Sequence, residues 1–305
     1  MMVGGYLNQP SPQRKLGDVV LSALDSSFRW NDKKVLGQRF PGAVARPVLV
    51  ARWAAFTLIV LGIVLAAPVA AAQITIAAAS STRPALDELV AAFSARHPDE
   101  QATVVYGASG KLFAQIRQGA PYDVFVSADT AYPEALFKAA MSDGAVQVYG
   151  FGRLVLWRTD CREGAPTMHS LGEASVKRIA IANPELAPYG QRTQQALQAA
   201  GLWDAVKGKL VFAENVGQAA QFALSKNAQV GIIALSLALA PAMRDAGCYA
   251  AVPDHLYEPL PQGFVVTRRG ADKPLAAAFA AFMTSAEAAS ILQRHGLEPF
   301  VVSPP

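Results

Sequence analysis

Hydroxyl-bearing and small residues recur in this sequence where an apolar run ends and a helical pattern begins. In the first half these points are Ala77-Ala78-Ala79-Ser80-Ser81 and Gly107-Ala108-Ser109-Gly110. In the second half they are Asn183-Pro184, continuing to Pro188-Tyr189-Gly190, and Glu214-Asn215-Val216-Gly217. Backbone N–H groups at a helix N-terminus attract anions, and α/β proteins bind ligands at the carboxyl edge of a sheet. One serine before a helix is an ordinary N-cap, but four such turns in two halves predict an anion held between two lobes.

Few charges accompany these turns. Arg83 and Lys111 are the cations beside them in the sequence. A dianion that is stripped of water needs a hydrogen bond at each oxygen. Neutral N–H and hydroxyl groups can supply these bonds, each of which contributes about 1.5–3 kcal/mol when one partner is charged. About six or seven such bonds are sufficient for micromolar to nanomolar affinity after the cost of association.

Residues that could support catalysis or hold a metal ion are scattered. The four histidines are His97, His169, His255 and His295. None of them has a partner at metal-ligand spacing, which predicts surface or structural roles. Ser109 lacks the G-x-S-x-G spacing of a nucleophile elbow, and Gly110-Lys111 lacks the rest of a P-loop. A hydrolase with Ser109 or Ser80 as nucleophile is the alternative from another class, but it has no base nearby in the sequence. We predict a protein that is not an enzyme and that uses no cofactor.

Composition and charge argue against two further classes. Of the 305 residues 52% are hydrophobic and 16% charged, as in a globular protein. Residues 1–72 carry eight Lys or Arg and three Asp, so 73–305 hold the other 19 basic and 20 acidic residues and are nearly neutral. A nucleic-acid-binding domain would concentrate positive charge, and no helix-turn-helix pattern indicates a ligand-sensing regulator. We therefore expect no nucleic-acid partner.

The N-terminal part has the pattern of an export signal behind an extension. An uncharged, largely apolar run at 54–67 follows two arginines and leads to an A-x-A cleavage site at 70–72. This layout is typical of a cleavable signal peptide, which we assign to 46–72, and it predicts a periplasmic location. An uncleaved membrane anchor is the alternative. Residues 1–45 are polar and predict either a disordered extension or a true start codon further along the sequence.

The two cysteines, Cys161 and Cys248, both lie in the predicted exported part. An even count in an oxidising compartment favours one disulfide between them. Two separate buried thiols are the alternative, because the pair is far apart in the sequence.

From residue 73 onward, short apolar strands alternate with amphipathic helices, and this rhythm restarts after Gly150. The alternation predicts an α/β fold of parallel sheets covered by helices. The predicted strands are 74–78, 102–106, 124–126, 154–157, 179–182, 210–213, 230–233, 249–252 and 264–267. The main predicted helices after residue 130 are 133–140, 191–200, 217–224, 235–244, 274–284 and 286–295.

Two stretches carry a family resemblance. One is Ile74-Thr75-Ile76-Ala77-Ala78-Ala79-Ser80; the other begins at Gly107-Ala108-Ser109-Gly110-Lys111-Leu112 and ends with Gly119-Ala120-Pro121-Tyr122-Asp123-Val124-Phe125-Val126-Ser127-Ala128-Asp129. They resemble periplasmic molybdate-binding proteins of molybdenum ABC importers, and the likeness covers nearly all of 73–305. The resemblance implies a type 2 periplasmic binding protein fold, with two Rossmann-like α/β lobes joined by a hinge of two strands. Lobe 1 would comprise 73–152 and 252–305, and lobe 2 would comprise 153–251.

The resemblance also implies a ligand, its donors and a partner. Molybdate or tungstate would lie between the lobes. Ser80 and Ser109 would each donate through the hydroxyl and the backbone N–H, and Tyr189 and Val216 through the backbone N–H alone. The protein would be a monomer that delivers this ligand to the permease of an ABC transporter in the inner membrane.

One position departs from the family pattern. Some members place a tyrosine hydroxyl on the anion where this chain has Ala234. Either Ser81 or Ser236 replaces that donor, or the anion is held by one bond fewer. Another tetrahedral oxyanion, such as sulfate, is therefore the alternative ligand.

Overall fold

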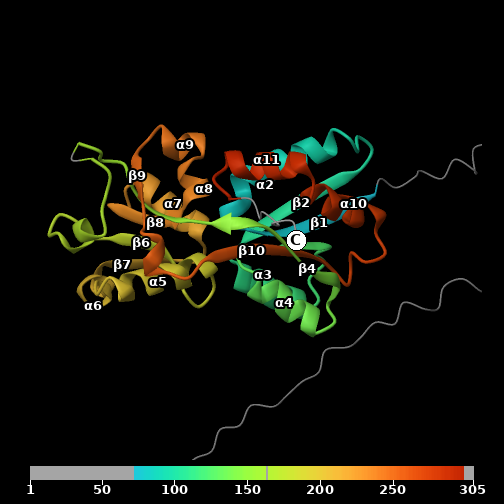
Figure 1. Ribbon diagram of the computed structural model, residues 1–305, viewed down its shortest axis with the longest axis horizontal. Helices are drawn as coiled ribbons and strands as arrows, with labels where there is room; N and C mark the ends of the chain where they lie inside the picture. The colour runs from blue at the N-terminus through green and yellow to red at the C-terminus, as the bar shows by residue number, and fades with distance from the viewer. Residues whose placement is uncertain (1–71, 163, 299–305) are drawn as a thin grey trace, which may run out of the picture. The chain divides into compact units, whose positions relative to one another are not determined.

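The computed structural model describes residues 72–162 and 164–298, which form two mixed sheets packed against helices (Figure 1). The predicted extension at 1–45, and all but the last residue of the predicted signal peptide at 46–72, lie outside the described residues.

The first sheet has the strand order β2-β1-β3-β10-β4. Its strands are β1 (Gln73–Ala79), β2 (Gln101–Gly107), β3 (Val124–Val126), β4 (Ser142–Gly152) and β10 (Leu260–Thr267). β1 is parallel to β2 and to β3, whereas β10 is antiparallel to β3 and to β4. The sheet is therefore mixed, whereas the alternation in the sequence predicted parallel sheets. The alternation of strands and helices predicts only the parallel strands. The antiparallel strand β10 follows directly from a crossing between the two sheets, with no α-helix between it and the preceding strand.

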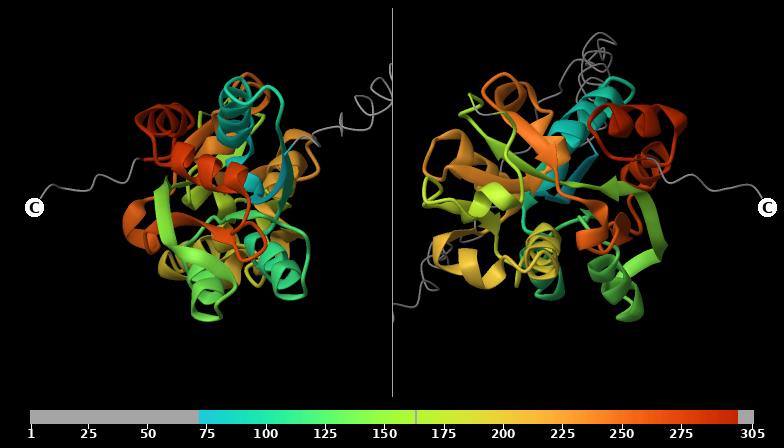
Figure 2. Two further views of the ribbon diagram at one scale, coloured as in Figure 1. Left: turned by 90° about the vertical axis from the view of Figure 1, so that its right-hand side faces the viewer. Right: turned by 60° about the vertical axis from the view of Figure 1, so that its left-hand side comes forward.

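Alternating side chains on these strands pack against two groups of helices, as the two-residue period of a strand requires. Ile74, Ile76 and Ala78 of β1 pack with buried residues of α2 (Arg83–Ser94), α10 (Pro274–Met283) and α11 (Ala286–Arg294). Ala77 and Phe125 face the other way and pack with α3 (Ser109–Arg117) and α4 (Ala131–Lys138). Figure 2 shows α10 and α11 in red on one side and α3 and α4 in green on the other.

The second sheet repeats this plan in the order β7-β6-β8-β5-β9. Its strands are β5 (Leu154–Arg158), β6 (Ile179–Ala182), β7 (Leu210–Ala213), β8 (Val230–Ala234) and β9 (Cys248–Ala251). Its helices are α5 (Pro188–Ala199), α6 (Trp203–Val206), α7 (Val216–Leu224), α8 (Leu235–Ala238) and α9 (Pro241–Arg244). β6 is parallel to β7 and β8, and β5 is antiparallel to β8 and β9. One apolar cluster that includes the fully buried Trp157 forms the core of this lobe.

The chain crosses between the two sheets twice. Only Arg153 separates the end of β4 from the start of β5, and residues 252–259 return the chain from β9 to β10. The strands of the first sheet fall within 73–152 and 252–305, and those of the second sheet fall within 153–251. Two sheets of this order with a double crossing confirm the predicted two-lobed fold of a type 2 periplasmic binding protein.

The sequence prediction missed the short helix α6 and differs from the structure at two larger elements. β4, with 11 residues, was missed because most of its side chains before Tyr149 are exposed or only partly buried and it carries Gly144 with a φ of 82°. The single helix predicted at 235–244 is two short helices, because Pro241 begins α9 and has no N–H for continuing α8.

Among the described residues, no single helix has both the length and the apolar composition to cross a membrane. Only α10 and α11 taken together reach them, and their axes are bent by 62° at the junction.

Candidate functional site

A small cavity between the two lobes brings together Ser80, Ser109, Tyr189 and Val216, the four residues expected to bind a ligand. The space in it that can hold the centre of a water molecule is about 10 Å³; about 180 Å³ is free of protein atoms when the open solvent at its mouth is counted. The other lining residues are Ala79, Ser81, Gly107, Ala108 and Ala128 from lobe 1 and Ala187, Pro188 and Asn215 from lobe 2.

Strand register places these residues at the carboxyl edges of the sheets. In the first sheet Ala79 is paired with Gly107, so the turns that follow β1 and β2 lie side by side. In the second sheet Ala182 is paired with Ala213. A 3-10 turn (Ser80–Thr82) that leads into α2, and the helices α3, α5 and α7, all begin at this cavity. Because the first N–H groups of a helix have no intrahelical acceptor, the cavity is surrounded by backbone donors and positive helix ends.

The hydroxyls of Ser80 and Ser109 are held by backbone N–H groups. Ser80 Oγ accepts a hydrogen bond from the Gly217 N–H across the lobes at 3.1 Å, and Ser109 Oγ accepts one from the Ala128 N–H at 3.0 Å. In each case the oxygen is the acceptor, so the hydroxyl hydrogen is available to a ligand. Both serines are buried.

Ser81 is a third hydroxyl on this wall. Its side chain is 1% exposed, and its Oγ has no hydrogen-bond partner within the described residues. A buried hydroxyl without a partner carries a desolvation cost of about 1–3 kcal/mol. A ligand in the cavity that accepts this hydrogen would remove that cost.

The lobe 2 wall offers backbone groups at the start of α7. The Gly217 N–H is bonded to Ser80, and the Gln218 N–H is bonded to the Asn215 side chain at 3.0 Å. The Ala219 N–H is bonded to the Asn215 carbonyl oxygen at 3.1 Å. The Val216 N–H is left without an acceptor among the described residues.

The first turn of α5 likewise contains a backbone N–H group without an acceptor. Pro188 has no N–H, and the Gln191 N–H is bonded to the Ala187 carbonyl oxygen at 3.1 Å. The N–H of Tyr189, in the first turn between them, has no acceptor in the described part of the chain. Tyr189 and Val216 therefore each present a backbone donor at the cavity.

No charged side chain is among the described residues that line the cavity. The nearest cations on the turns have other partners. Lys111 Nζ is 2.8 Å from Glu214 Oε1 of the other lobe, in a pair whose side chains are 49% and 43% exposed. Arg83 stacks on the Tyr106 ring at 3.9 Å. The cavity is a set of neutral dipoles, as predicted from the turns.

Ser236 does not line the cavity, so the structure does not support it as a substitute donor. Its hydroxyl donates to the Ser81 carbonyl oxygen of the other lobe at 2.7 Å, which uses its hydrogen. Ala234, where a tyrosine was expected in some relatives, is fully buried at the end of β8 and does not line the cavity either. Ser81 is the one of the two candidates that lies in position.

The most specific sequence stretch, Gly119 to Asp129, serves mainly to support the first sheet. Asp123 is 1% exposed, and its Oδ2 accepts hydrogen bonds from the Thr75 N–H and Lys273 Nζ, both at 2.8 Å. Asp129 Oδ1 accepts one from Ser127 Oγ at 2.9 Å, while burial raises the pKa of the Asp129 carboxyl. Of this stretch only Ala128 lines the cavity.

No base that could activate a serine lines the cavity within the described ranges. His97 pairs with Glu100 at 2.6 Å, and His295 pairs with Glu88 at 2.7 Å. His169 and His255 lie in short 3-10 turns. No cluster of three metal-ligating side chains occurs in 72–162 or 164–298. The arrangement suits binding of an anion.

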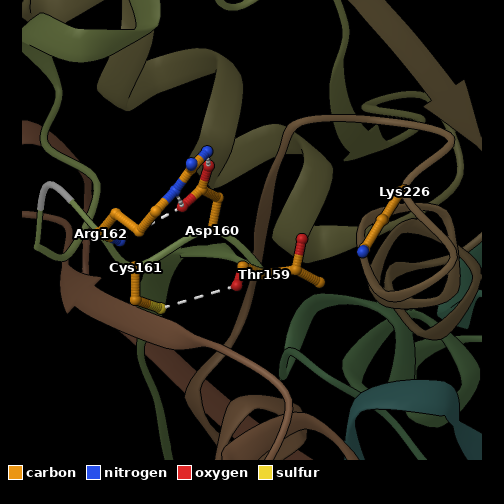
Figure 3. A pocket seen from close by; sticks show the side chains of 5 residues that line it. All are labelled: Thr159, Asp160, Cys161, Arg162 and Lys226. Carbon is orange, nitrogen blue, oxygen red and sulfur yellow. Dashed lines mark hydrogen bonds and ion pairs between the residues drawn. The ribbon is translucent and has the colours of Figure 1, made fainter.

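A second hollow lies beside the disulfide that joins Cys161 and Cys248, whose Cα atoms are 5.9 Å apart. Figure 3 shows that Arg162 turns toward Asp160, with 2.6 Å between Nη2 and Oδ2. Both side chains are largely exposed, so an anion here would compete with water and with Asp160. This hollow is not the candidate site.

Comparison with known proteins agrees with the fold. Residues 74–298 match the family described as bacterial extracellular solute-binding protein. The chain is 32% identical over 233 residues to the molybdate-binding protein ModA of Rhodobacter capsulatus, covering 76% of this chain and 90% of the relative. It is also 32% identical over 233 residues to ModA of Azotobacter vinelandii, covering 76% and 92%. The solved periplasmic molybdate-binding protein of Azotobacter vinelandii superposes with a TM-score of 0.68 at 31% identity, covering 76% of this chain and all of that structure.

The chain therefore belongs to the bacterial extracellular solute-binding proteins. Its similar relatives are binding proteins by name.

Proposed function

We propose that this protein captures molybdate or tungstate in the cavity between its lobes and delivers it to the permease of an ABC importer. The single observation that carries the proposal is the set of neutral donors from both lobes around one small cavity. The molybdate-binding relatives of similar length support this choice among the tetrahedral oxyanions.

The donors match the needs of a dianion with four oxygens. Lobe 1 offers the hydroxyl hydrogens of Ser80, Ser81 and Ser109, and lobe 2 offers the N–H groups of Tyr189 and Val216. Each hydrogen bond to a charged acceptor contributes about 1.5–3 kcal/mol, so five bonds outweigh the cost of association. The positive ends of the helices at the cavity add to this without a counter-charge that would have to be desolvated.

Capture would proceed by closure of the lobes. Ser80 and the Gly217 N–H are bonded across the cleft, as are the Gly110 N–H and the Leu186 carbonyl oxygen at 2.9 Å. A ligand bound by both walls favours the closed form by its differential affinity. In this proposal the closed form is the one that the permease recognises, and the protein works outside the cytoplasm as a monomer after removal of the segment at 46–72.

Thermal unfolding of the purified protein with molybdate, tungstate, sulfate or phosphate tests this proposal. A ligand present at 100 times its Kd stabilises the folded state by about 2.7 kcal/mol. We expect a clear rise in Tm with molybdate and tungstate and little rise with sulfate or phosphate. A rise with sulfate alone would make this a sulfate receptor, and no rise with any of the four would overturn an oxyanion function.

A further inference from the structure

Three buried polar side chains form a chain of hydrogen bonds behind the cavity. They are Tyr149 on β4, Gln262 on β10 and Tyr189 on α5, with exposed fractions of 5%, 0% and 1%. The Tyr149 hydroxyl is 2.7 Å from Gln262 Oε1, and Gln262 Nε2 is 3.0 Å from the Tyr189 hydroxyl. β4 and β10 belong to the first sheet and α5 to lobe 2, so the Gln262–Tyr189 bond joins the lobes.

This interlobe network lies at the hinge. Gly152 is the last residue of β4, directly before the crossing at Arg153. A Cβ atom at Gly152 would overlap Gln262 Nε2 and the Tyr189 hydroxyl oxygen. The absence of a side chain at Gly152 therefore leaves the space that the network fills.

Each hydroxyl hydrogen of the two tyrosine side chains can find an acceptor within or beside the network. The Tyr149 hydroxyl has one hydrogen but is 2.7 Å from two acceptors, the Ser127 carbonyl oxygen and Gln262 Oε1. If the Gln262 amide is rotated by a half turn, the Tyr189 hydroxyl donates to the Gln262 amide oxygen and the Gln262 amide nitrogen donates to the Tyr149 hydroxyl. The Tyr149 hydroxyl then donates to the Ser127 carbonyl oxygen. Burial raises the pKa of both tyrosines, so both hydroxyls keep their hydrogens. A fully satisfied network in a dry environment is stronger than the same bonds in water.

Tyr189 belongs to the cavity and to this network at the same time. Tyr189 lines the cavity, while its hydroxyl is hydrogen-bonded to Gln262. Its carbonyl oxygen accepts a hydrogen bond from Thr193 Oγ1 at 2.8 Å, which fixes it to the first turn of α5. A rigid residue thus connects the ligand donor to both hinge strands.

We propose that the Tyr149–Gln262–Tyr189 network is a closure device, in which Gln262 is a positioning residue that holds the Tyr189 N–H on the bound anion. The ligand in this inference rests on the proposed function. In the open form water solvates Gln262 and the Tyr189 hydroxyl, so the bond between them stabilises the closed form alone. Its loss therefore accelerates ligand release and leaves the open form unaffected.

The test compares Tyr189→Phe and Gln262→Met with a matched control, Tyr257→Phe. The Tyr257 hydroxyl accepts from the Leu154 N–H at 3.2 Å beside the same crossing, and it makes no bond to the first sheet. The measurements are molybdate dissociation by stopped-flow fluorescence, Kd by calorimetry, and Tm without ligand.

We expect Tyr189→Phe and Gln262→Met each to raise the dissociation rate and the Kd about tenfold, because each leaves a buried polar group unpaired in the closed form. Ligand-free Tm should stay unchanged, and Tyr257→Phe should alter Kd less than about twofold. The double variant should be no worse than the poorer single variant, since both remove the same bond. An unchanged dissociation rate, or an equal loss of Tm with and without ligand, would overturn the closure role and reduce the network to static packing.

The wild-type titration in the same series separates this inference from the proposed function. If the wild type binds molybdate and Tyr189→Phe releases it no faster, only the closure role fails. If the wild type binds sulfate and not molybdate, the proposed ligand fails, and the same variants are compared with sulfate.

Discussion

The two walls of the cavity solve the same problem with different chemistry. In the proposed site, lobe 1 contributes the hydroxyls of Ser80, Ser81 and Ser109 beside the backbone N–H groups expected of Ser80 and Ser109, whereas lobe 2 contributes only the backbone N–H groups of Tyr189 and Val216. A hydroxyl donor depends on the residue type at its position. A backbone donor depends only on where a helix begins, and every residue except proline supplies it. The hydroxyl donors of lobe 1 therefore depend on residue type, whereas the donors of lobe 2 depend on backbone geometry alone.

The largest loss of affinity is expected when a backbone donor of lobe 2 is removed without changing a polar side chain. Val216→Pro removes the N–H and puts a ring carbon in its place. Proline suits the first position of α7, and the extended Asn215 before it (φ −146°, ψ 169°) tolerates it. We expect a loss of molybdate affinity of roughly 100-fold or more, from the lost bond and the added volume together. Calorimetry measures this loss.

Val216→Ala is the matched control, because it keeps the N–H. Its affinity should stay within about threefold of wild type, although lost packing lowers stability. A large loss in both variants would mean that the Val216 side chain matters and would contradict the backbone assignment.

Substitution of two serines with different hydrogen-bond partners tests the hydroxyl donors of lobe 1. Ser109→Ala and Ser81→Ala should each lower molybdate affinity about 10- to 150-fold, since each removes one hydrogen bond to a charged acceptor. Their effects on the ligand-free protein should differ. Ser109→Ala leaves the buried Ala128 N–H without its acceptor and should lower the free energy of unfolding by about 1–3 kcal/mol.

Ser81→Ala removes a hydroxyl that has no partner within the described residues and should not lower ligand-free stability. Denaturant unfolding without ligand, beside a calorimetric titration, distinguishes the two. Full affinity in Ser81→Ala would remove Ser81 from the site and leave the anion with one donor fewer on this wall.

A smaller effect is expected from the ion pair between the lobes. Lys111 and Glu214 are about half exposed, and such pairs contribute about 0.2–1 kcal/mol. Lys111→Gln should therefore weaken molybdate binding by less than about fivefold, and Glu214→Gln should do the same. A loss above tenfold for Lys111→Gln alone would show that its positive charge attracts the anion directly.

The smallest effect is expected from pH. No titratable group except the tyrosine hydroxyl of Tyr189 lies among the described lining residues, and burial raises the pKa of Tyr189 and Tyr149. A raised tyrosine pKa means that the folded state holds its proton more tightly than the unfolded state. This contribution is complete below the unfolded pKa of about 10 and is lost only as pH rises through the folded value. Molybdate affinity should vary less than about threefold between pH 6 and pH 9. A tenfold fall across this window would point to a titrating base in the site.

The two walls were also unequally predictable from the sequence. Ser80, Ser81 and Ser109 could be proposed because hydroxyls after apolar strands are visible in the residue types. The turns that contain Tyr189 and Val216 were also visible in the sequence, but their backbone N–H groups, like the hydroxyls of Ser80 and Ser109, were assigned as ligand donors through the family resemblance. Ser236 was a wrong candidate, since only the structure shows that its hydrogen goes to the Ser81 carbonyl oxygen.

The elements of the fold also differ in how well the sequence predicts them. Strands and helices with regular apolar periods were predicted to within a few residues in most cases. β4 was missed, because its exposed polar residues hide a strand that is held by β10, more than 100 positions away. The Tyr149–Gln262 bond spans 113 positions and could not be found in any local pattern. Long-range pairing decides these features, and local sequence does not contain it.

The most direct test of the account is anomalous diffraction near the molybdenum absorption edge from crystals grown with molybdate. The account predicts one strong peak in the cavity, with its oxygens within hydrogen-bond distance of the hydroxyls of Ser80 and Ser109 and the N–H groups of Tyr189 and Val216. An empty cavity, or a peak held by charged side chains elsewhere on the surface, would contradict it.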